Sequence, residues 1–291
     1  MQKLKCYLCA QRVSPYLVKN GYTLFQCQTC GLIQTDLKKE YQKFVKEYYD
    51  KGYFTGDPKY CAYDEYERDK VYILANLKKM FGRLANYLGQ GTLLDVGCAM
   101  GHLVKYANTR GWDAYGFDPS AYALSRVPQE YKYKVKNGTI DTVSYKPGMF
   151  DAVTMLDVIE HLKDPVGNLK KVRTFLKDDG YLVIATGDIR SAAAKLFAKH
   201  WTFFNPPQHL FFFSKKTLSE VLRISGFKPI EWFTLGKWLS LGYTLHLGRS
   251  VAESRLAGKL YNVIMKFKLG KLPLFIPMND NMVVIAKKVK S

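Results

Sequence analysis

The sequence predicts an α/β protein with a sheet of mostly parallel strands and helices on both of its faces. From Thr92 onward, short apolar runs alternate with stretches in which apolar residues recur every three or four positions, and this is the pattern of alternating strands and helices. The first apolar run contains Asp95 and leads into a glycine-rich turn, which lets the backbone approach a ligand closely. Two Cys-x-x-Cys pairs near the N-terminus predict an additional small metal-binding module.

Composition and charge limit the possible classes of protein. Hydrophobic residues make up 47% of the chain and aromatic residues 14%, which indicates a packed core. No apolar run reaches the roughly 20 residues needed to span a bilayer, and no signal-peptide pattern follows Met1, so we expect a cytoplasmic protein. The net charge of +19 favours an anionic partner (nucleic acid, a phosphorylated substrate or an anionic membrane face) or else reflects a solvated basic surface.

The first unit, residues 1–36, is predicted to be a zinc-ribbon-like module. Its four cysteines are Cys6, Cys9, Cys27 and Cys30. Four thiolates with no open position suit tetrahedral Zn²⁺ in a structural role, and in so small a module the metal would support folding. Redox cysteines are the alternative. We expect the module to be a docked lid or a spacer, although zinc ribbons can also contact nucleic acid.

Residues 37–90 form a tyrosine-rich leader that ends in an amphipathic helix. The leader is rich in tyrosine, with seven of them at Tyr41, Tyr48, Tyr49, Tyr53, Tyr60, Tyr63 and Tyr66. The stretch from Tyr53 to Pro58 contains Gly and Pro and is expected to be a loop. A helical apolar face then follows, formed by Val71, Leu74, Leu77, Phe81, Leu84 and Leu88. We expect the tyrosines to pack in the core or an interface, or to cover a ligand cavity.

The stretch from Leu93 to Leu103 has the pattern of a strand, a tight turn and the start of a helix. A second strand-like run ends in Asp118, and Pro119 opens the next helix. Because the carboxyl ends of parallel strands meet at one edge of a sheet, these two strand ends should border one crevice, where an acid can hold both hydroxyls of a ribose. The turn lacks the full dinucleotide spacing, so NAD is not favoured.

The remaining elements follow in the same alternating order. Further strands are expected at 131–135, 150–157 and 181–186, then after Gly226 and at 282–286. Further helices are expected from about Glu160, from Asp164 and from the capping residue Ser214, and a turn is expected at 178–180. Residues 237–280 are interpreted as a basic, apolar insertion between the last two strands. It could cap the active site or lie on an anionic membrane.

Three segments together resemble the class I S-adenosylmethionine-dependent methyltransferases. They are Asp95-Val-Gly-Cys-Ala-Met-Gly101, Phe150-Asp-Ala-Val with Glu160-His-Leu162, and Leu176-Lys-Asp-Asp-Gly-Tyr-Leu-Val-Ile184. The resemblance covers residues 91–291 and implies a seven-stranded Rossmann-like sheet with an antiparallel last strand. The ribbon and leader are similar to those of bacterial methyltransferases of glycan, sugar or secondary-metabolite biosynthesis. Ala99 departs from the family pattern, which has glycine at this position.

The resemblance also implies which residues bind S-adenosylmethionine. The methionine part is expected near Asp95, Gly97, Cys98, Ala99 and Gly101, the ribose near Asp118 and Pro119, and the sulfonium near Asp157. Asp141 is the nearest acid to the expected adenine position, although its place in the sequence is offset from the family pattern.

For catalysis, His209 is the leading candidate for the base that takes a hydroxyl proton, because it lies in an aromatic, proline-broken segment where the family places substrate-facing loops. His161 and Asp157 are the next candidates. We therefore expect an O-methyltransferase acting on a small molecule, a sugar or glycan, or a lipid-linked saccharide. An RNA methyltransferase, less favoured without an Asn-Pro-Pro-Tyr-type motif, and a non-catalytic cofactor-binding protein remain alternatives.

Overall fold

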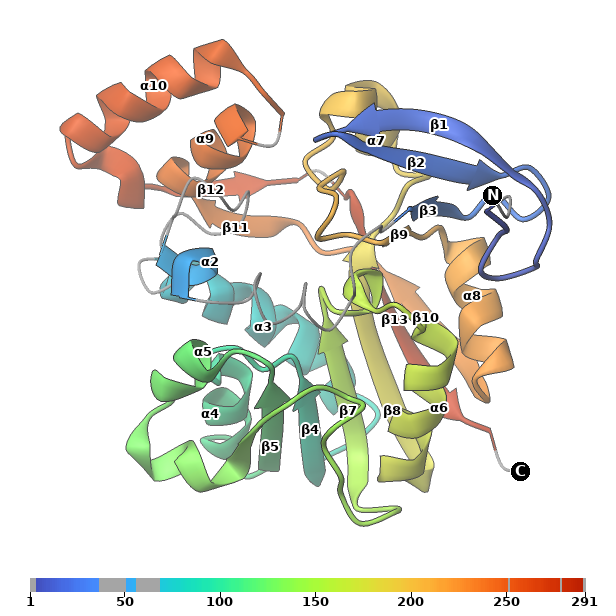
Figure 1. The fold of residues 1–291 in the computed structure, drawn as a ribbon. Coiled ribbons are helices and arrows are strands. Elements are labelled where there is room, and N and C mark those ends of the chain that lie inside the picture. The colour runs from blue at the N-terminus through green and yellow to red at the C-terminus, as the bar shows by residue number, and fades with distance from the viewer. Residues whose placement is uncertain (1–3, 37–50, 56–68, 251, 278, 290–291) are drawn as a thin grey trace.

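In the computed structural model, which describes residues 4–36, 51–55, 69–250, 252–277 and 279–289, the predicted α/β fold is confirmed (Figure 1). A seven-stranded sheet has the order β10-β13-β8-β7-β4-β5-β6. Its strands are β4 (Thr92–Val96), β5 (Asp113–Asp118), β6 (Val135–Asn137), β7 (Phe150–Leu156), β8 (Leu176–Gly187), β10 (Phe227–Phe233) and β13 (Asn281–Lys288). As predicted, the last strand, β13, runs antiparallel to both of its neighbours, β8 and β10.

Helices cover both faces of this sheet because successive side chains of each strand point to opposite sides. On one face, Leu94 and Met155 pack with α6 and α8; on the other, Leu93 and Ala152 pack with α3 and α4. The helices are α2 (Lys51–Thr55), α3 (Lys70–Ala85), α4 (His102–Asn108), α5 (Ala121–Ser125), α6 (Pro165–Phe175), α7 (Ala192–Phe197) and α8 (Lys215–Ile224). Ser214 caps α8 as predicted, through a bond that its side chain accepts from the Thr217 N–H.

The structure corrects several expected boundaries. Residues 129–134 form a short 3₁₀ helix, η1 (Gln129–Lys134), and the third strand begins only at Val135. One reason is that the Lys134 amine turns back to Asp113 and Asn108, with which it bonds. Glu160 and His161 also lie in a 3₁₀ turn, η2 (Ile159–His161).

Two further expectations about turns and loops were wrong. Residues 178–180 belong to β8. Phe150 of β7 pairs with Leu176 of β8, but Ala152, two residues further along β7, pairs with Tyr181, five residues further along β8. The expected turn is therefore a bulge within β8. Tyr53–Thr55 are helical in α2 rather than a loop. Val71 was expected on the buried apolar face of α3, but its side chain is 71% exposed. Of the seven leader tyrosines named from sequence, all except Tyr53 lie outside the described residues, as does Cys61.

The N-terminal ribbon continues into the methyltransferase-like part as a single sheet. Strands β1 (Val13–Lys19), β2 (Tyr22–Cys27) and β3 (Ile33–Thr35) pair antiparallel, and β3 then pairs with β9 (Phe211–Phe212). The Thr35 hydroxyl also donates to the His209 carbonyl at 2.9 Å, and the Thr35 N–H donates to the Leu210 carbonyl. The ribbon therefore forms a wall behind the segment that carries His209.

Residues 237–280 form a lobe between β10 and β13 (Figure 1). Its elements are β11 (Lys237–Ser240), α9 (Leu241–Ser250), α10 (Arg255–Lys266), η4 (Leu269–Lys271) and β12 (Pro273–Ile276). Strands β11 and β12 pair antiparallel, and the side chain of Asn76 on α3 exchanges two hydrogen bonds with the backbone of Trp238. This contact ties the lobe to the helix that precedes the sheet. None of the described helices is long and apolar enough to cross a membrane.

Candidate active site

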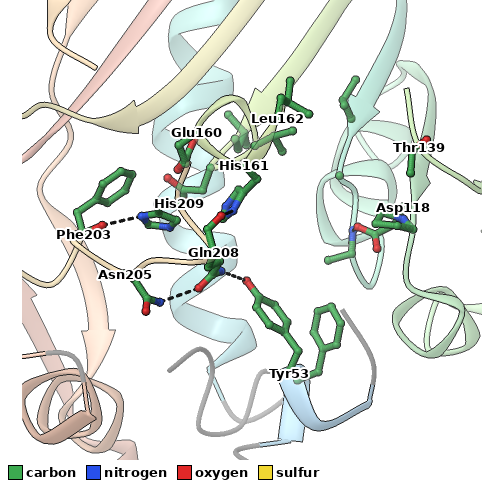
Figure 2. Close-up of a pocket in the computed structure, with 18 of the residues that line it drawn as sticks. Tyr53, Asp118, Thr139, Glu160, His161, Leu162, Phe203, Asn205, Gln208 and His209 are labelled. Atoms are coloured by element: carbon green, nitrogen blue, oxygen red, sulfur yellow. Dashed lines mark hydrogen bonds between the residues drawn. The ribbon is translucent and has the colours of Figure 1, made fainter. Parts of the chain in front are cut away.

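The carboxyl ends of β4, β5 and β7 open into two adjoining cavities, of about 320 Å³ and about 230 Å³. Both are lined by Gly97, Leu156, Asp157, Lys237 and Tyr243, so they meet at the turn after β4. The larger cavity extends from the end of β5 to the segment that carries His209 (Figure 2). The smaller one extends under α3 and contains Asp95 and Cys98.

The turn after β4 has the backbone shape of a ligand cradle. Gly97, Ala99 and Gly101 all have positive φ angles, of 73°, 45° and 70°. A Cβ atom on Gly97 would lie 2.7 Å from a methyl group of Val158, so a side chain cannot be added there without displacing the start of η2. Ala99 takes the left-handed conformation that glycine adopts more easily. The turn thus keeps the predicted shape despite the alanine.

The two strand-end acids lie on either side of this turn. Asp118 accepts hydrogen bonds from the N–H groups of Ala99 and Ser120, at 2.9 Å and 2.8 Å, which fixes its carboxylate at the edge of the larger cavity. Asp95 accepts one from the Thr154 hydroxyl at 2.7 Å. Burial raises the pKa of Asp95 to about 7 and that of Asp118 to about 6, since ionised carboxylates are costly to desolvate.

The other cofactor positions predicted from sequence are placed as follows. Pro119 and Ala99 line the larger cavity, and Cys98 lines the smaller one. Gly101 precedes α4 and makes the turn without lining either cavity. Asp141, the acid considered for the adenine, is not among the residues that line the larger cavity: its carboxylate accepts a bond from the Asn168 side chain at 3.0 Å, and Thr139 and Ile140 line the cavity.

A polar cluster closes the far end of the larger cavity. Glu160 and His161 come from η2, and His209 comes from the segment before β9 (Figure 2). The Nδ1 atom of His209 lies 2.6 Å from the Phe203 carbonyl, and the Nδ1 atom of His161 lies 2.9 Å from the Gln208 carbonyl. A carbonyl can only accept, so each Nδ1 carries a proton, and the neutral His209 ring then has its lone pair on Nε2. The His161 ring also interacts with the backbone of Asp157. The two rings are 4.8 Å apart.

The electrostatics of this cluster favour neutral histidines. Burial lowers the pKa of His161, and burial together with the neighbouring His161 lowers the pKa of His209 well below its usual value. Burial, reinforced by the nearby Asp157, raises the pKa of Glu160 well above its usual value. The Glu160 side chain is fully buried and accepts a bond from the Thr186 hydroxyl on Oε2. Among the described residues, its Oε1 atom has no hydrogen-bond partner.

Asp157 occupies the junction between the two cavities. It follows β7 directly, lines both cavities and has a φ of 51°, a strained value for a residue other than glycine. Its backbone N–H donates to the Ala185 carbonyl, which holds this conformation against the neighbouring strand. The structure therefore brings the three predicted catalytic residues, His209, His161 and Asp157, to one cavity.

Several cavity residues had no role assigned from sequence. Lys237 on β11 lines both cavities; burial opposes its charge, but Asp157, Asp280 and Glu160 raise its pKa. The signal that could have identified it is a single lysine within an otherwise apolar strand pattern. Gln208 accepts from the Asn205 amide and donates to the Tyr53 hydroxyl, at 2.7 Å and 2.8 Å. This chain links α2 to the acceptor region (Figure 2).

The four ribbon cysteines also converge. Sulfur–sulfur distances are 3.5 Å for Cys6–Cys30 and for Cys9–Cys27, and all four sulfurs lie within 4.8 Å of one another. Zn–S bonds of about 2.3 Å in a tetrahedron place the sulfurs about 3.8 Å apart, so the cluster has the size of a Cys₄ zinc site. Burial opposes ionisation of Cys27, but the N–H groups of Cys30 and Thr29 lower its pKa to about 6.

Comparison with known proteins identifies the family. The profile of the methyltransferase domain family matches residues 63–231. Ubiquinone biosynthesis O-methyltransferases of Chromobacterium violaceum and Acinetobacter baumannii are 32% and 30% identical to the chain over 115 and 113 residues. These matches cover 36% of this chain and 48% and 47% of the relatives, so the chain spans about half the length of the curated relatives it matches.

Solved structures share the fold at low sequence identity. One is the 1,6-didemethyltoxoflavin-N1-methyltransferase of Burkholderia thailandensis, with bound 1,6-didemethyltoxoflavin and S-adenosylhomocysteine; it has a TM-score of 0.57 and 16% identity, over 95% of this chain and all of that one. Another is an S-adenosylmethionine-dependent methyltransferase of Archaeoglobus fulgidus, with a TM-score of 0.53 and 20% identity, over 81% and 99%. Together with the glycine turn and its two acids, these findings confirm the predicted resemblance: the chain belongs to the methyltransferase domain family and has the fold of S-adenosylmethionine-dependent methyltransferases.

Proposed function

We propose that this protein transfers the methyl group of S-adenosylmethionine to a hydroxyl group of a small-molecule, sugar or lipid-linked saccharide acceptor. The observation that carries the proposal is the shared cavity of about 320 Å³, which has Asp118 at one end and the Glu160–His161–His209 cluster at the other. One cavity can therefore hold the methyl donor and present its methyl group to an acceptor beside polar side chains. In-line transfer depends mainly on such positioning.

The residues around the turn after β4 fit the cofactor. Gly97, Cys98, Ala99 and Gly101 would form the cradle for its methionine part, with Asp95 able to attract the amino group from the smaller cavity. Asp118 would bind the ribose hydroxyls beside Pro119. Asp157 would lie near the sulfonium. When bound, the cofactor supplies an electrophilic methyl group, and the protein's part is to hold that group opposite the acceptor oxygen.

The acceptor hydroxyl must lose its proton as the new C–O bond forms. His209 supports this step because its Nδ1 donates to the Phe203 carbonyl, which leaves a lone pair on Nε2 of the neutral ring. His161 is held in the same way by Gln208. The O-methyltransferase names of the partial relatives agree with a hydroxyl acceptor. Because the ribbon supports β9, its presence in the chain does not require an RNA ligand.

A lipid-borne acceptor is supported by the outer face of the lobe. Three apolar side chains of α10 and the Phe267 side chain at its C-terminal end are exposed at helical spacing: Leu256 (67%), Leu260 (45%), Val263 (50%) and Phe267 (66%). Basic residues surround them, at Arg255, Lys259, Lys266, Lys268 and Lys271. An apolar stripe bordered by positive charge suits an anionic membrane surface. The inner side of the same lobe contributes Tyr243 and Leu247 to the acceptor cavity.

The ribbon would bind one structural Zn²⁺ through Cys6, Cys9, Cys27 and Cys30. The size of the cysteine cluster and the ionisable Cys27 thiol support this assignment. Because β3 of the ribbon pairs with β9, the metal would stabilise the segment that carries His209, in addition to the ribbon itself.

The experiment is a transfer assay with labelled S-adenosylmethionine and a panel of phenols, sugars and lipid-linked saccharides. The purified protein should label at least one hydroxyl acceptor, and an Asp118→Ala variant should require far more cofactor. Label appearing only in amines, or in RNA at an equal rate, would contradict the proposal. Adding anionic vesicles should raise the rate with lipid-linked acceptors and leave the rate with soluble acceptors unchanged.

A further inference from the structure

We propose that Lys237 is a catalytic residue whose ammonium group donates a hydrogen bond to the reacting oxygen of the acceptor. This inference rests on the proposed function and adds a cationic group to the histidines already described. Lys237 is the first residue of β11 and lines both cavities where they meet, together with Gly97 and Asp157. Among the described residues that line the two cavities, it is the only lysine or arginine. A negative charge that develops on an acceptor in this space therefore has one such cation within the cavity lining.

The Lys237 ammonium is available to a ligand. In the part of the chain that the structure describes, it forms neither a hydrogen bond nor an ion pair with another side chain or with the backbone, although it faces the cavities. Lys134, a buried lysine, instead has its ammonium 2.6 Å from the Asp113 carboxylate. An ammonium has three N–H donors and no acceptor. The donors of Lys237 can therefore bind an oxygen atom of a molecule in the cavity.

Nearby acids keep Lys237 charged without bonding to it. Burial opposes the charge, but three acids raise the pKa of the ammonium above its usual value: Asp157, Asp280 and Glu160. All three line the larger cavity, whereas Asp95, which lines only the smaller one, is not among them. The charge of Lys237 therefore acts mainly at the acceptor end of the larger cavity, rather than beside the expected methionine part of the cofactor.

The same charge acts on the proposed base. Burial and the neighbouring His161 lower the pKa of His209, and Lys237 lowers it further. A histidine with so low a pKa is a weak base, so it can take a hydroxyl proton only if the negative charge left on the oxygen is stabilised. A positive charge within about 4–6 Å favours the ionised form of an acid. Lys237 thus weakens the base but makes the acceptor hydroxyl a stronger acid.

The reaction balances with these two residues and the cofactor. The acceptor hydroxyl gives its proton to Nε2 of His209, while its oxygen accepts a hydrogen bond from Lys237. The oxygen forms a bond to the methyl carbon of S-adenosylmethionine as the bond from that carbon to sulfur breaks, and the electron pair stays on sulfur. Lys237 remains protonated throughout, and His209 then releases its proton to water. The products are a methyl ether, S-adenosylhomocysteine and one proton.

The first test follows the ionisation of a bound phenol and needs no methyl transfer. The probe is 4-nitrophenol, whose ionised form is coloured, added to an excess of full-length protein with S-adenosylhomocysteine present. Its titration midpoint should lie about 1–3 pH units lower with wild-type protein than with Lys237→Met, the range for a nearby opposite charge. Lys237→Arg keeps the charge and should retain most of this difference. Equal midpoints with wild type and Lys237→Met would overturn the inference.

The second test measures turnover and cofactor affinity. Lys237→Met should lower turnover about 10²–10³-fold, the range for loss of one donor to an oxyanion. The loss should grow along a series of phenols as the hydroxyl becomes less acidic, because an electron-poor ring stabilises its own negative charge. S-adenosylmethionine affinity should stay within about twofold, as for an interaction made only with the reacting acceptor, and this measurement also shows that the variant is folded. Lys228→Met, the same change at an exposed residue of β10, should leave both quantities unchanged.

A loss of cofactor affinity in Lys237→Met, with normal turnover once the cofactor is saturating, would assign Lys237 to the cofactor's carboxylate and overturn the inference. The proposed function fails separately. If the phenol titration shifts as expected but wild-type protein methylates no hydroxyl acceptor, Lys237 still binds a phenolate oxygen and the function does not stand. If Lys237→Met methylates hydroxyl acceptors at the wild-type rate, the function stands and the catalytic role of Lys237 does not.

Discussion

The proposed cofactor end and the proposed acceptor end of the cavity differ in how much of the chain each one needs. At the cofactor end, Asp95, Gly97 and Asp118 come from two consecutive strands and the turn between them. At the acceptor end, His161, His209 and Lys237 come from three separate segments, and the ribbon supports one of them. A methyl donor can thus be bound by a local unit, whereas acceptor recognition depends on long-range assembly. Changes at one end should therefore leave the other end functional.

The largest expected effect is at the acceptor end. His209→Ala should lower turnover by roughly 10²–10⁴, the range for loss of a general base, and should leave S-adenosylmethionine affinity within about twofold. Single-turnover rates and calorimetry would measure the two quantities. Because the pKa of His209 lies well below its usual value, the wild-type rate should fall only under acidic conditions, when the ring takes up a proton. Turnover near the wild-type value in the variant, with only stability reduced, would assign His209 to structure.

The converse experiment is at the cofactor end. Asp118→Ala should weaken S-adenosylmethionine binding by about 1.5–3 kcal/mol, the range for hydrogen bonds to a charged group. Asp113→Ala is the matched control, because Asp113 begins the same strand and pairs with Lys134 far from the cofactor turn. Calorimetry should show a loss of affinity only in the Asp118 variant. An equal loss in both variants would mean that β5 is perturbed as a whole and that the ribose contact is misassigned.

The ribbon tests whether the acceptor end depends on remote support. Elemental analysis should find about one zinc per chain when no chelator or added metal is present. Cys27→Ser should lower zinc content and reduce turnover by up to about 10²-fold, since the segment with His209 would shift, while S-adenosylmethionine affinity stays within about twofold. Protein purified without chelator that holds no zinc would refute the site. A large loss of cofactor affinity in Cys27→Ser would refute the separation of the two ends.

The same contrast explains what the sequence could predict. Apolar runs ending in Asp95 and Asp118 indicate a strand end and a cofactor crevice because all the information lies within a few neighbouring residues. The antiparallel β13 followed from the family resemblance. The start of β6 was misplaced because the bonds of Lys134 to Asp113 and Asn108 span more than 20 residues. The only local signal at Lys237 is that it is a single lysine in an apolar strand pattern, and this signal does not show that its side chain lines a cavity.

The cluster of Glu160, His161 and His209 could be predicted in part from the sequence. His161 and His209 were recognised individually as candidates, but nothing in their spacing indicates that the rings would lie 4.8 Å apart. Their proximity depends on the bond between Leu210 and Glu160 backbones and on the pairing of β9 with the ribbon. That Oε1 of Glu160 has no hydrogen-bond partner in the described part of the chain is seen only when its neighbours are in place. Sequence identifies the chemical groups, and tertiary contacts determine which of them act together.

A smaller effect, on pH dependence, should again separate the ends. Since burial raises the pKa of Asp95 to about 7, lowering the pH from 8 to about 6 should protonate it and weaken binding of cationic S-adenosylmethionine roughly tenfold. The free energy of unfolding of the ligand-free protein should change with pH in the opposite direction. Because the native state binds the Asp95 proton more tightly than the unfolded state does, the contribution of Asp95 to stability falls as the pH rises from 4 to 7. Asp95→Asn should flatten both trends; an unchanged slope of affinity against pH would exclude Asp95 as the cause.

The smallest expected effect concerns Ala99, the alanine that stands in the cofactor turn with a φ of 45°. Ala99→Gly should relieve left-handed strain but add flexibility to the unfolded chain, so the free energy of unfolding should rise by only about 0.5–1 kcal/mol.

Ala10→Gly is the matched control, since Ala10 has a φ of 57° in the ribbon, far from the cavities. Both variants should gain similar stability in denaturant titrations. Only Ala99→Gly should change S-adenosylmethionine affinity, by less than about threefold, because Ala99 lines the larger cavity and the backbone N–H that binds Asp118 is retained. An affinity change in Ala10→Gly would show that the cofactor end responds to the ribbon, contrary to the local construction argued for it.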